Sequence, residues 1–145
     1  MKTVKQLLQG KGSDVWSVAP TTSVYEALAL MAGKNVGALL VLKAGQLVGI
    51  FSERDYARKV ALQGKTSKDT PVSEIMTSKV VYVRPEQTIE DCMALMTDKH
   101  IRHLPVLADD HQVLGVISIG DVVKAVISEQ SFIIEQLENY ITGAR

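Results

Sequence analysis

Two short segments of this chain carry a serine followed three residues later by an aspartate: Ser52-Glu53-Arg54-Asp55 and Ser118-Ile119-Gly120-Asp121. Each follows a glycine and two apolar residues, so we expect a strand to end at the serine and a helix to begin just after it. Such a corner gathers free backbone N–H groups, a hydroxyl and a carboxylate. The N–H groups and the hydroxyl suit phosphate or ribose oxygens, and the carboxylate suits ribose hydroxyls, as in dinucleotide sites.

An ordinary structural role explains the same residues without a ligand. A serine at the start of a helix caps it. An aspartate in the first turn complements the positive end of the helix. Because both corners are intact, the ribose role is favoured, and capping stays open as the alternative.

The two corners belong to a longer internal repeat. Pro20 and Pro85 lie 65 residues apart, whereas Gly49 and Gly115 lie 66 residues apart. The extra residue of the second copy falls within residues 108–112, a polar turn where insertions are tolerated. A weaker similarity links residues 4–8 to residues 72–76, so a short leading segment precedes each copy.

Composition excludes several classes of protein. The 16 basic residues balance the 16 acidic ones, which argues against a nucleic-acid surface. The single cysteine, Cys92, has no partner for an internal disulfide, which indicates a reducing compartment, and its position on the apolar side of a predicted helix indicates a core residue. The chain has no signal-peptide core and no apolar run near the ~18 residues of a membrane span. We therefore predict a cytoplasmic protein that binds neither nucleic acid nor membrane.

The first copy predicts the order strand, helix, strand, strand, helix. A short helix within residues 1–9 and a glycine turn at residues 10–13 precede it, and this turn lacks the spacing of a phosphate loop. Ser23 and Glu26 have the form of a capping box. The expected elements are a strand at residues 16–18, a helix at 23–35, a strand at 38–42, its antiparallel partner at 47–51, and a helix at 52–62.

The second copy predicts the same order after a polar linker at residues 63–69. A short helix begins at Thr70-Pro71 with the proline at its first position. The expected elements are a strand at residues 80–83, a helix at 88–99, paired strands at 102–107 and 113–117, and a helix at 120–127. Pro105 indicates an edge or a strand end. Residues 131–142 form an amphipathic helix, which packs either on its own domain or in a dimer contact.

Taken together, these residues resemble a pair of cystathionine β-synthase (CBS) domains, the tandem arrangement called a Bateman module. The resemblance rests on residues 72–77, 81–85 and 101–106 together with the two glycine–serine–aspartate segments, and it covers roughly residues 3–127. It implies an α+β (α/β-like) fold of two units packed about a pseudo-twofold axis. The units are residues 1–69, with the N-terminal helix and linker, and residues 70–127, followed by a C-terminal amphipathic helix at 128–145.

The resemblance also implies a function. The family is regulatory and not enzymatic, and its clefts commonly bind AMP, ADP or ATP, sometimes NAD(H) or S-adenosylmethionine. The chain is similar to the stand-alone bacterial type, which often forms homodimers. By this resemblance Asp55 and Asp121 each hold a ribose, and Ser52 and Ser118 contact ribose or phosphate. The residues that would complete the Asp55 cleft are Ser78, Val80, Val81 and Ile101, and those for the Asp121 cleft are Val15, Ser17, Val36 and Ala38. For Val36, Ala38 and Val80, packing in the core is the alternative.

The two clefts are expected to differ. By the crossed arrangement of the family, Arg102 and His103 face the ligand held by Asp55, and Arg54 lies beside that aspartate. Because arginine recognises phosphate through several donors, we predict that the Asp55 cleft prefers a phosphorylated ligand. The Asp121 cleft, with Gly37 and Ala38, has fewer cations, so a different ligand, a less charged one, or none is expected there. The alternative is that Arg102 and His103 are solvated surface residues.

Three functions compete at this point. The favoured one is a regulatory module that senses adenine nucleotides or NAD. The second is a dimeric interaction protein that docks on an unidentified regulated partner without a physiological nucleotide. Neither an enzyme nor a metal site is expected, because no nucleophile–base pair and no zinc-ligand spacing is present.

Overall fold

The computed structural model describes residues 2–143; Met1, Ala144 and Arg145, which the predicted units 1–69 and 128–145 include, lie outside the described residues. The described chain mixes helices and strands, which confirms the α+β class. It divides into two compact units. The β2–β3 unit comprises Asp14–Tyr82 and Asp109–Val113; the β4–β5 unit comprises the chain up to Ser13, Val83–Ala108 and the chain from Leu114 onward.

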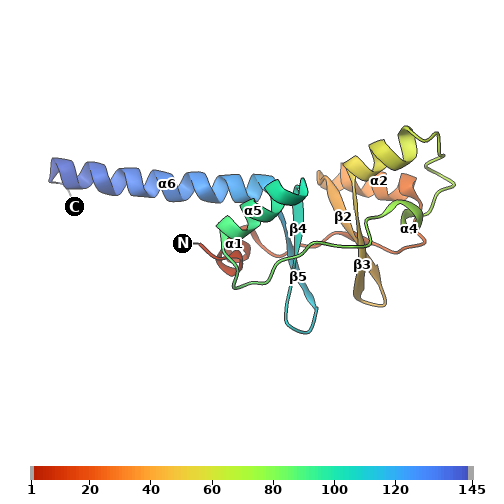
Figure 1. The fold of residues 1–145 in the computed structure, drawn as a ribbon, viewed down its shortest axis with the longest axis horizontal. Coiled ribbons are helices and arrows are strands. Elements are labelled where there is room, and N and C mark those ends of the chain that lie inside the picture. Colours follow the sequence, from red (N-terminus) through yellow and green to blue (C-terminus); the bar gives the residue numbers. More distant parts are fainter. Residues whose placement is uncertain (1, 144–145) are drawn as a thin grey trace. The chain divides into compact units, whose positions relative to one another are not determined.

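The β2–β3 unit is built on a three-stranded sheet with the order β1-β2-β3 (Figure 1). Strand β1 is parallel to β2, and β2 is antiparallel to β3, as predicted for the hairpin. Its elements are β1 (Ser17–Val18), α2 (Val24–Lys34), β2 (Ala38–Lys43), β3 (Gln46–Ser52), α3 (Glu53–Tyr56), the π-helix η1 (Ala57–Ala61) and α4 (Val72–Ile75).

Local sequence explains the ends of these elements. Ser23 caps α2 by accepting a hydrogen bond from the Glu26 N–H at 3.1 Å. Ala44 and Gly45 both have positive φ, the backbone that lets a two-residue loop join twisted antiparallel strands. The core of the unit contains Val24, Ala27, Met31, Leu39, Val41, Phe51, Val60, Val72 and Ile75, all buried. The sheet and α2 therefore form as the hydrophobic pattern predicts.

The β4–β5 unit is built on a two-stranded sheet. Thr88 and Asp91 form a complete capping box at the start of α5, as the sequence predicts. Thr3 and Gln6 form another at the start of α1. The elements are α1 (Val4–Lys11), α5 (Ile89–Lys99), β4 (His103–Leu107), β5 (Val113–Ser118) and α6 (Ile119–Thr142).

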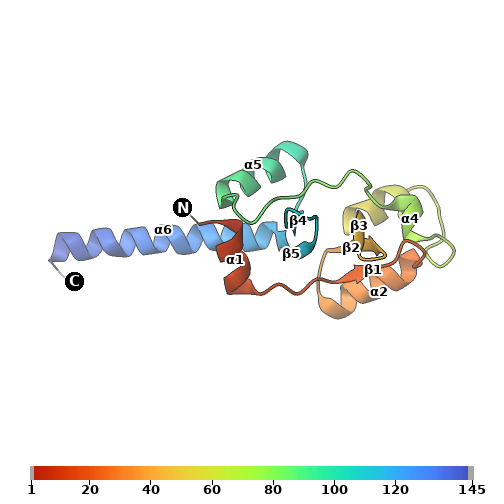
Figure 2. The same ribbon diagram turned by 90° about the horizontal axis from the view of Figure 1, so that it is seen from below.

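Each compact unit contains the leading segment of the other repeat. Thr77, after α4, pairs with Ile50 of β3 through hydrogen bonds of 2.9 and 3.0 Å. In the other unit, Leu8 of α1 lies so close to Gly115 of β5 that a Cβ at this glycine would be 2.8 Å from Leu8 Cδ2. Figures 1 and 2 both show α1 beside the β5–α6 junction. The repeat boundaries at residues 69 and 127 stay a prediction, but the packing groups residues 2–13 with the second repeat.

The strand predicted at residues 80–83 does not form. Only Val83 pairs with β4: its N–H donates to the Pro105 carbonyl, and its carbonyl accepts from the Leu107 N–H, both at 3.0 Å. Extension of this parallel pairing to Val81 would require an N–H at Pro105, which proline lacks. The proline therefore limits the pairing to one residue.

Three helix boundaries also differ from the prediction. Helix α1 continues through Gly10, where a glycine turn was expected, and ends at Lys11, followed by the C-cap Gly12, whose φ is 96°. Pro71 is the residue before α4, not its first residue. The helices predicted at residues 120–127 and 131–142 are one continuous helix, α6, because no glycine or proline interrupts residues 121–142.

Cys92 is a core residue, as predicted, and lies fully buried in α5. Burial, together with the nearby Asp91 and Glu90 carboxylates, raises the pKa of the Cys92 thiol to about 11. A disulfide reagent that modifies thiols should therefore react with Cys92 at pH 8 at least ~100-fold more slowly in the native protein than in the protein unfolded in urea. Equal rates in the two states would contradict the buried position of this thiol.

Candidate functional site

The first serine–aspartate corner lies where β3 ends and α3 begins. Ser52 Oγ accepts a hydrogen bond from the Asp55 N–H at 3.2 Å, and Asp55 Oδ2 accepts from the Ser52 N–H at 3.0 Å. These reciprocal bonds form a capping box. The Ser52 hydroxyl also donates to Asp55 Oδ2 at 3.2 Å. The local sequence thus fixes the carboxylate at the start of the helix.

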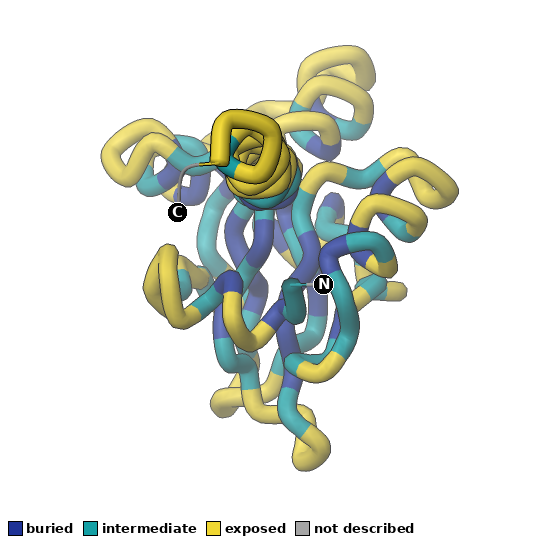
Figure 3. The backbone as a smooth tube through the Cα atoms, turned by 90° about the vertical axis from the view of Figure 1, so that its left-hand side faces the viewer, coloured by how far each residue is buried: buried dark blue, intermediate teal, exposed yellow. Residues whose placement is uncertain are grey.

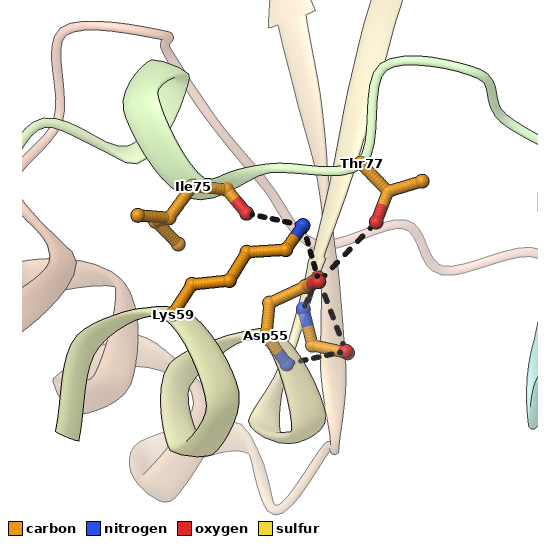
Figure 4. Close-up of polar contacts among 5 residues, drawn as sticks. Asp55, Lys59, Ile75 and Thr77 are labelled. Atoms are coloured by element: carbon orange, nitrogen blue, oxygen red, sulfur yellow. Dashed lines mark hydrogen bonds and ion pairs between the residues drawn. The ribbon is translucent and has the colours of Figure 1, made fainter. Parts of the chain in front are cut away.

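The other carboxylate oxygen of Asp55 is held from two further segments (Figure 4). Lys59 Nζ of η1 lies 3.1 Å from Asp55 Oδ1, and Thr77 Oγ1 donates to the same oxygen at 3.2 Å. The ammonium of Lys59 also donates to the Ile75 carbonyl at 3.2 Å. The Asp55 side chain is only 10% exposed. Asp55 therefore ties β3, α3, η1 and the end of α4 together.

The second corner repeats this plan at the junction of β5 and α6. Asp121 Oδ2 accepts from the Ser118 N–H at 2.8 Å, and Ser118 Oγ accepts from the Asp121 N–H at 3.2 Å. Lys11 Nζ, at the end of α1, lies 2.7 Å from Asp121 Oδ2 and donates to the Val116 carbonyl at 2.8 Å. The Asp121 side chain is 23% exposed, so this corner is more open than the first.

The electrostatic environment favours a charged Asp121. Burial disfavours the carboxylate, but the hydrogen bond and charge of Lys11 and the hydrogen bonds from Ser118 outweigh it. The pKa of Asp121 therefore lies below its ordinary value. At neutral pH the corner presents a carboxylate with an ammonium directly beside it.

The two lysines come from different places in the chain. Lys59 follows Asp55 by four residues, whereas Lys11 precedes Asp121 by 110 residues. Sequence reasoning missed Lys11, Lys59 and Thr77. The i, i+4 spacing could have indicated Lys59. Lys11 stands in the segment that was interpreted as a glycine turn, and only packing brings it to Asp121. The expectation that the Asp121 site has fewer cations therefore omitted one.

The segments that lead into the hairpins border the corners of their own units. The Gly37 carbonyl accepts from the Glu53 N–H at 3.1 Å, and Ala38 pairs with Ser52. In the other unit the Arg102 carbonyl accepts from the Ile119 N–H at 2.8 Å. The sequence assigned Gly37 and Ala38 to the Asp121 cleft, and Arg102 to the Asp55 cleft. These crossed assignments stay predictions.

The remaining candidates divide between the units. Ser78, Val80 and Val81 lie in the unit of Asp55, as do Val15, Ser17 and Val36. Ile101 and His103 lie in the unit of Asp121. Arg54, Arg102, Ser17 and Ser78 are exposed. The apolar candidates are all partly exposed rather than sealed in the core: Val15, Val36, Ala38, Val80, Val81 and Ile101.

Two kinds of feature are absent from the described part of the chain. Between residues 2 and 143, no three His, Cys, Asp or Glu side chains are grouped so that they could hold a metal ion. No helix in the same range has the length and apolar character needed to cross a membrane.

Comparison with known proteins finds one family repeatedly. The model of the CBS domain matches residues 11–62 and 72–128. The mitochondrial CBS domain-containing protein CBSX3 of Arabidopsis thaliana is 42% identical over 151 residues, which cover 97% of this chain and 72% of that protein. The cytoplasmic location stays a prediction.

Solved structures agree with this match. A protein with CBS domains from Burkholderia ambifaria is 52% identical, with a TM-score of 0.85 over 89% of this chain and 96% of that chain. A structure of CBSX2 in complex with AMP is 28% identical, with a TM-score of 0.72 over 90% of this chain and 99% of that chain.

Proposed function

Because this chain belongs to the CBS domain family and contains two CBS domains, we propose that it is a regulatory protein whose serine–aspartate corners bind an adenosine-containing nucleotide. A relative that carries AMP supports this class of ligand. AMP, ADP and ATP are the first candidates, and NAD(H) and S-adenosylmethionine are the next. No catalytic role is assigned to either corner.

One observation carries the proposal: each corner places a lysine ammonium on the aspartate carboxylate, although the two lysines come from unrelated segments. A carboxylate accepts hydrogen bonds from the two hydroxyls of a ribose. An ammonium beside it suits the phosphate of the same nucleotide. When the ribose hydroxyls bind the carboxylate, they displace the lysine ammonium from it. The ammonium then contacts the phosphate of the same nucleotide.

The corners differ in how readily a ribose reaches the carboxylate. Asp55 accepts from Ser52, Thr77 and Lys59, and its side chain is nearly buried. Asp121 is held by Ser118 and Lys11 and is more exposed. A ligand at Asp121 has to displace only the Lys11 side chain, so this corner binds first. Arg54 beside Asp55 adds a cation for a phosphorylated ligand at the other corner.

Thermal unfolding with and without ligand tests the proposal. The ligands are AMP, ADP, ATP, NAD⁺, NADH and S-adenosylmethionine, with adenosine as the form without phosphate. A ligand at about 100 times its Kd adds roughly 2.7 kcal/mol of stability. This should raise the Tm by several degrees, at ~2–4 °C per kcal/mol. If the Tm stays unchanged with all of these ligands, the proposed function is contradicted.

Conservative variants locate the site. Asp121→Asn should weaken binding by about 10- to 100-fold, because the amide lacks the charge that strengthens hydrogen bonds from ribose. Lys11→Met should weaken AMP binding but not adenosine binding. Asp91→Asn is the matched control, since Asp91 forms the same capping box on α5 outside both corners. Full affinity in both Asp55→Asn and Asp121→Asn would exclude the corners as the ribose site.

A dimeric interaction protein is the second candidate. The exposed apolar side chains of α6, including Ile134 at 55% and Leu137 at 57%, favour a contact with another protein chain. This function needs no nucleotide, and it becomes the leading one if the ligand screen is negative.

A further inference from the structure

Helix α6 carries an exposed apolar stripe along most of its length. Figure 3 shows the distal turns of α6 mostly exposed. The exposed fractions run from 50% at Val123 to 80% at Ile141. The members of this α6 stripe are Val123, Ile127, Ile134, Leu137 and Ile141. Exposure of so many large apolar residues in one line marks a surface that another chain covers.

The spacing of the stripe is that of a two-helix seam. Its members follow one another at intervals of four, seven, three and four residues, and Gln130 fills the position that divides the interval of seven. Alternating steps of three and four give the 3.5-residue period of helices that pack side by side. The occupant of the stripe is therefore a second helix that lies nearly parallel or antiparallel to α6.

The described part of the β4–β5 unit does not cover the distal half of α6. Residues 131–138 are exposed without exception, including Phe132 and Ile133 on other faces of the helix. Figures 1 and 2 both show α6 continuing past α1 and α5. The second helix thus comes from outside this unit.

Charge selects the direction of pairing of two α6 helices. Lys124 lies near the start of the stripe, whereas Glu129, Glu135 and Glu138 follow it. A parallel pair would place Lys124 beside Ile119 and Glu138 beside Ile133 of the other copy, so no opposite charges would meet. An antiparallel pair that overlaps the whole stripe places Val123 opposite Ile141, Ile127 opposite Leu137, and Gln130 opposite Ile134. In this register Lys124 of each copy lies near Glu138 of the other, so opposite charges meet twice.

We propose that two copies of this chain pair antiparallel through the α6 stripe, with Lys124 of one copy beside Glu138 of the second copy. The contact is symmetric, as in most two-copy assemblies. It needs neither corner and no nucleotide, so it stands independently of the proposed function.

Charge exchange tests this pairing by sedimentation equilibrium without nucleotide. Lys124→Glu and Glu138→Lys should each weaken the dimer by about 4- to 30-fold, because two attractive pairs become repulsive. An equimolar mixture of the two variants should regain the affinity of the unaltered protein, since opposite charges then meet again. The loss should shrink in 1 M salt. A mixture that stays as weak as the single variants would overturn the antiparallel register.

A seam variant and its control test the surface itself. Ile134→Glu should abolish the dimer, whereas Phe132→Glu, on the opposite side of α6, should leave it unchanged. Both residues are more than half exposed, so neither substitution removes a core side chain; circular dichroism checks that the variants fold. A protein that sediments as a monomer at every concentration, or a dimer that tolerates Ile134→Glu, would overturn the proposal.

Discussion

Replacing Asp55 with alanine should lower the free energy of unfolding by about 2–4 kcal/mol, far more than replacement of a surface carboxylate. The substitution removes the acceptor of the Ser52 N–H, the Thr77 hydroxyl and the Lys59 ammonium at once. Lys59 is 41% exposed, so water replaces part of its ion pair, and the loss stays below that of a fully buried pair. Urea unfolding followed by circular dichroism measures the change.

Two matched variants separate the local cap from the tertiary contacts. Asp91→Ala removes the same capping position on α5 and should cost about 1 kcal/mol. Asp121→Ala should lower the free energy of unfolding by about as much as Asp91→Ala. Lys11 and Asp121 are both partly exposed, so their ion pair contributes little. If Asp55→Ala costs no more than Asp91→Ala, then Thr77 and Lys59 contribute nothing to the stability of the first corner.

Gly49→Ala should also destabilise the protein, by about 1–3 kcal/mol. A Cβ at Gly49 would lie 2.5 Å from Met76 Sδ and 3.1 Å from the Thr77 carbonyl oxygen. The Met76 side chain can rotate, but the Thr77 carbonyl is fixed by the hydrogen bond from the Ile50 N–H. Alanine therefore forces apart β3 and the segment after α4. The Tm should fall by ~2–4 °C per kcal/mol lost.

Alanine substitutions at other glycines are controls for which the expected change in stability is different. Gly115→Ala meets only the end of the flexible Leu8 side chain, so its cost should be smaller. Gly33 lies in α2, and apart from its chain neighbours and the adjacent helix backbone no atom lies within 4 Å of a methyl group added there, so Gly33→Ala should stabilise the protein by up to ~1 kcal/mol. The double variant Gly49→Ala/Met76→Ala should lose less free energy of unfolding than the sum of the losses in the two single variants. Strict additivity would contradict the contact with Met76.

Sequence alone located both corners because a capping box is a short-range structure. Ser52 and Asp55, or Ser118 and Asp121, need only three residues of chain to find each other, and their bonds form wherever a helix starts there. The same locality explains why the helices at residues 23–35 and 88–99 and the hairpin through Ala44 and Gly45 were predicted correctly. The repeat itself needed only the comparison of the chain with itself.

Tertiary structure alone decided which segments complete each corner. Lys11 reaches Asp121 across 110 residues, and Thr77 reaches Asp55 because α4 packs on β3. No local pattern encodes such contacts, since they depend on which apolar surfaces meet when the chain collapses. The same packing left the Asp55 side chain nearly buried and the Asp121 side chain more exposed, although both belong to the same type of capping box. Two motifs with the same serine and aspartate thus acquire different surroundings, because burial and partners come from the rest of the chain.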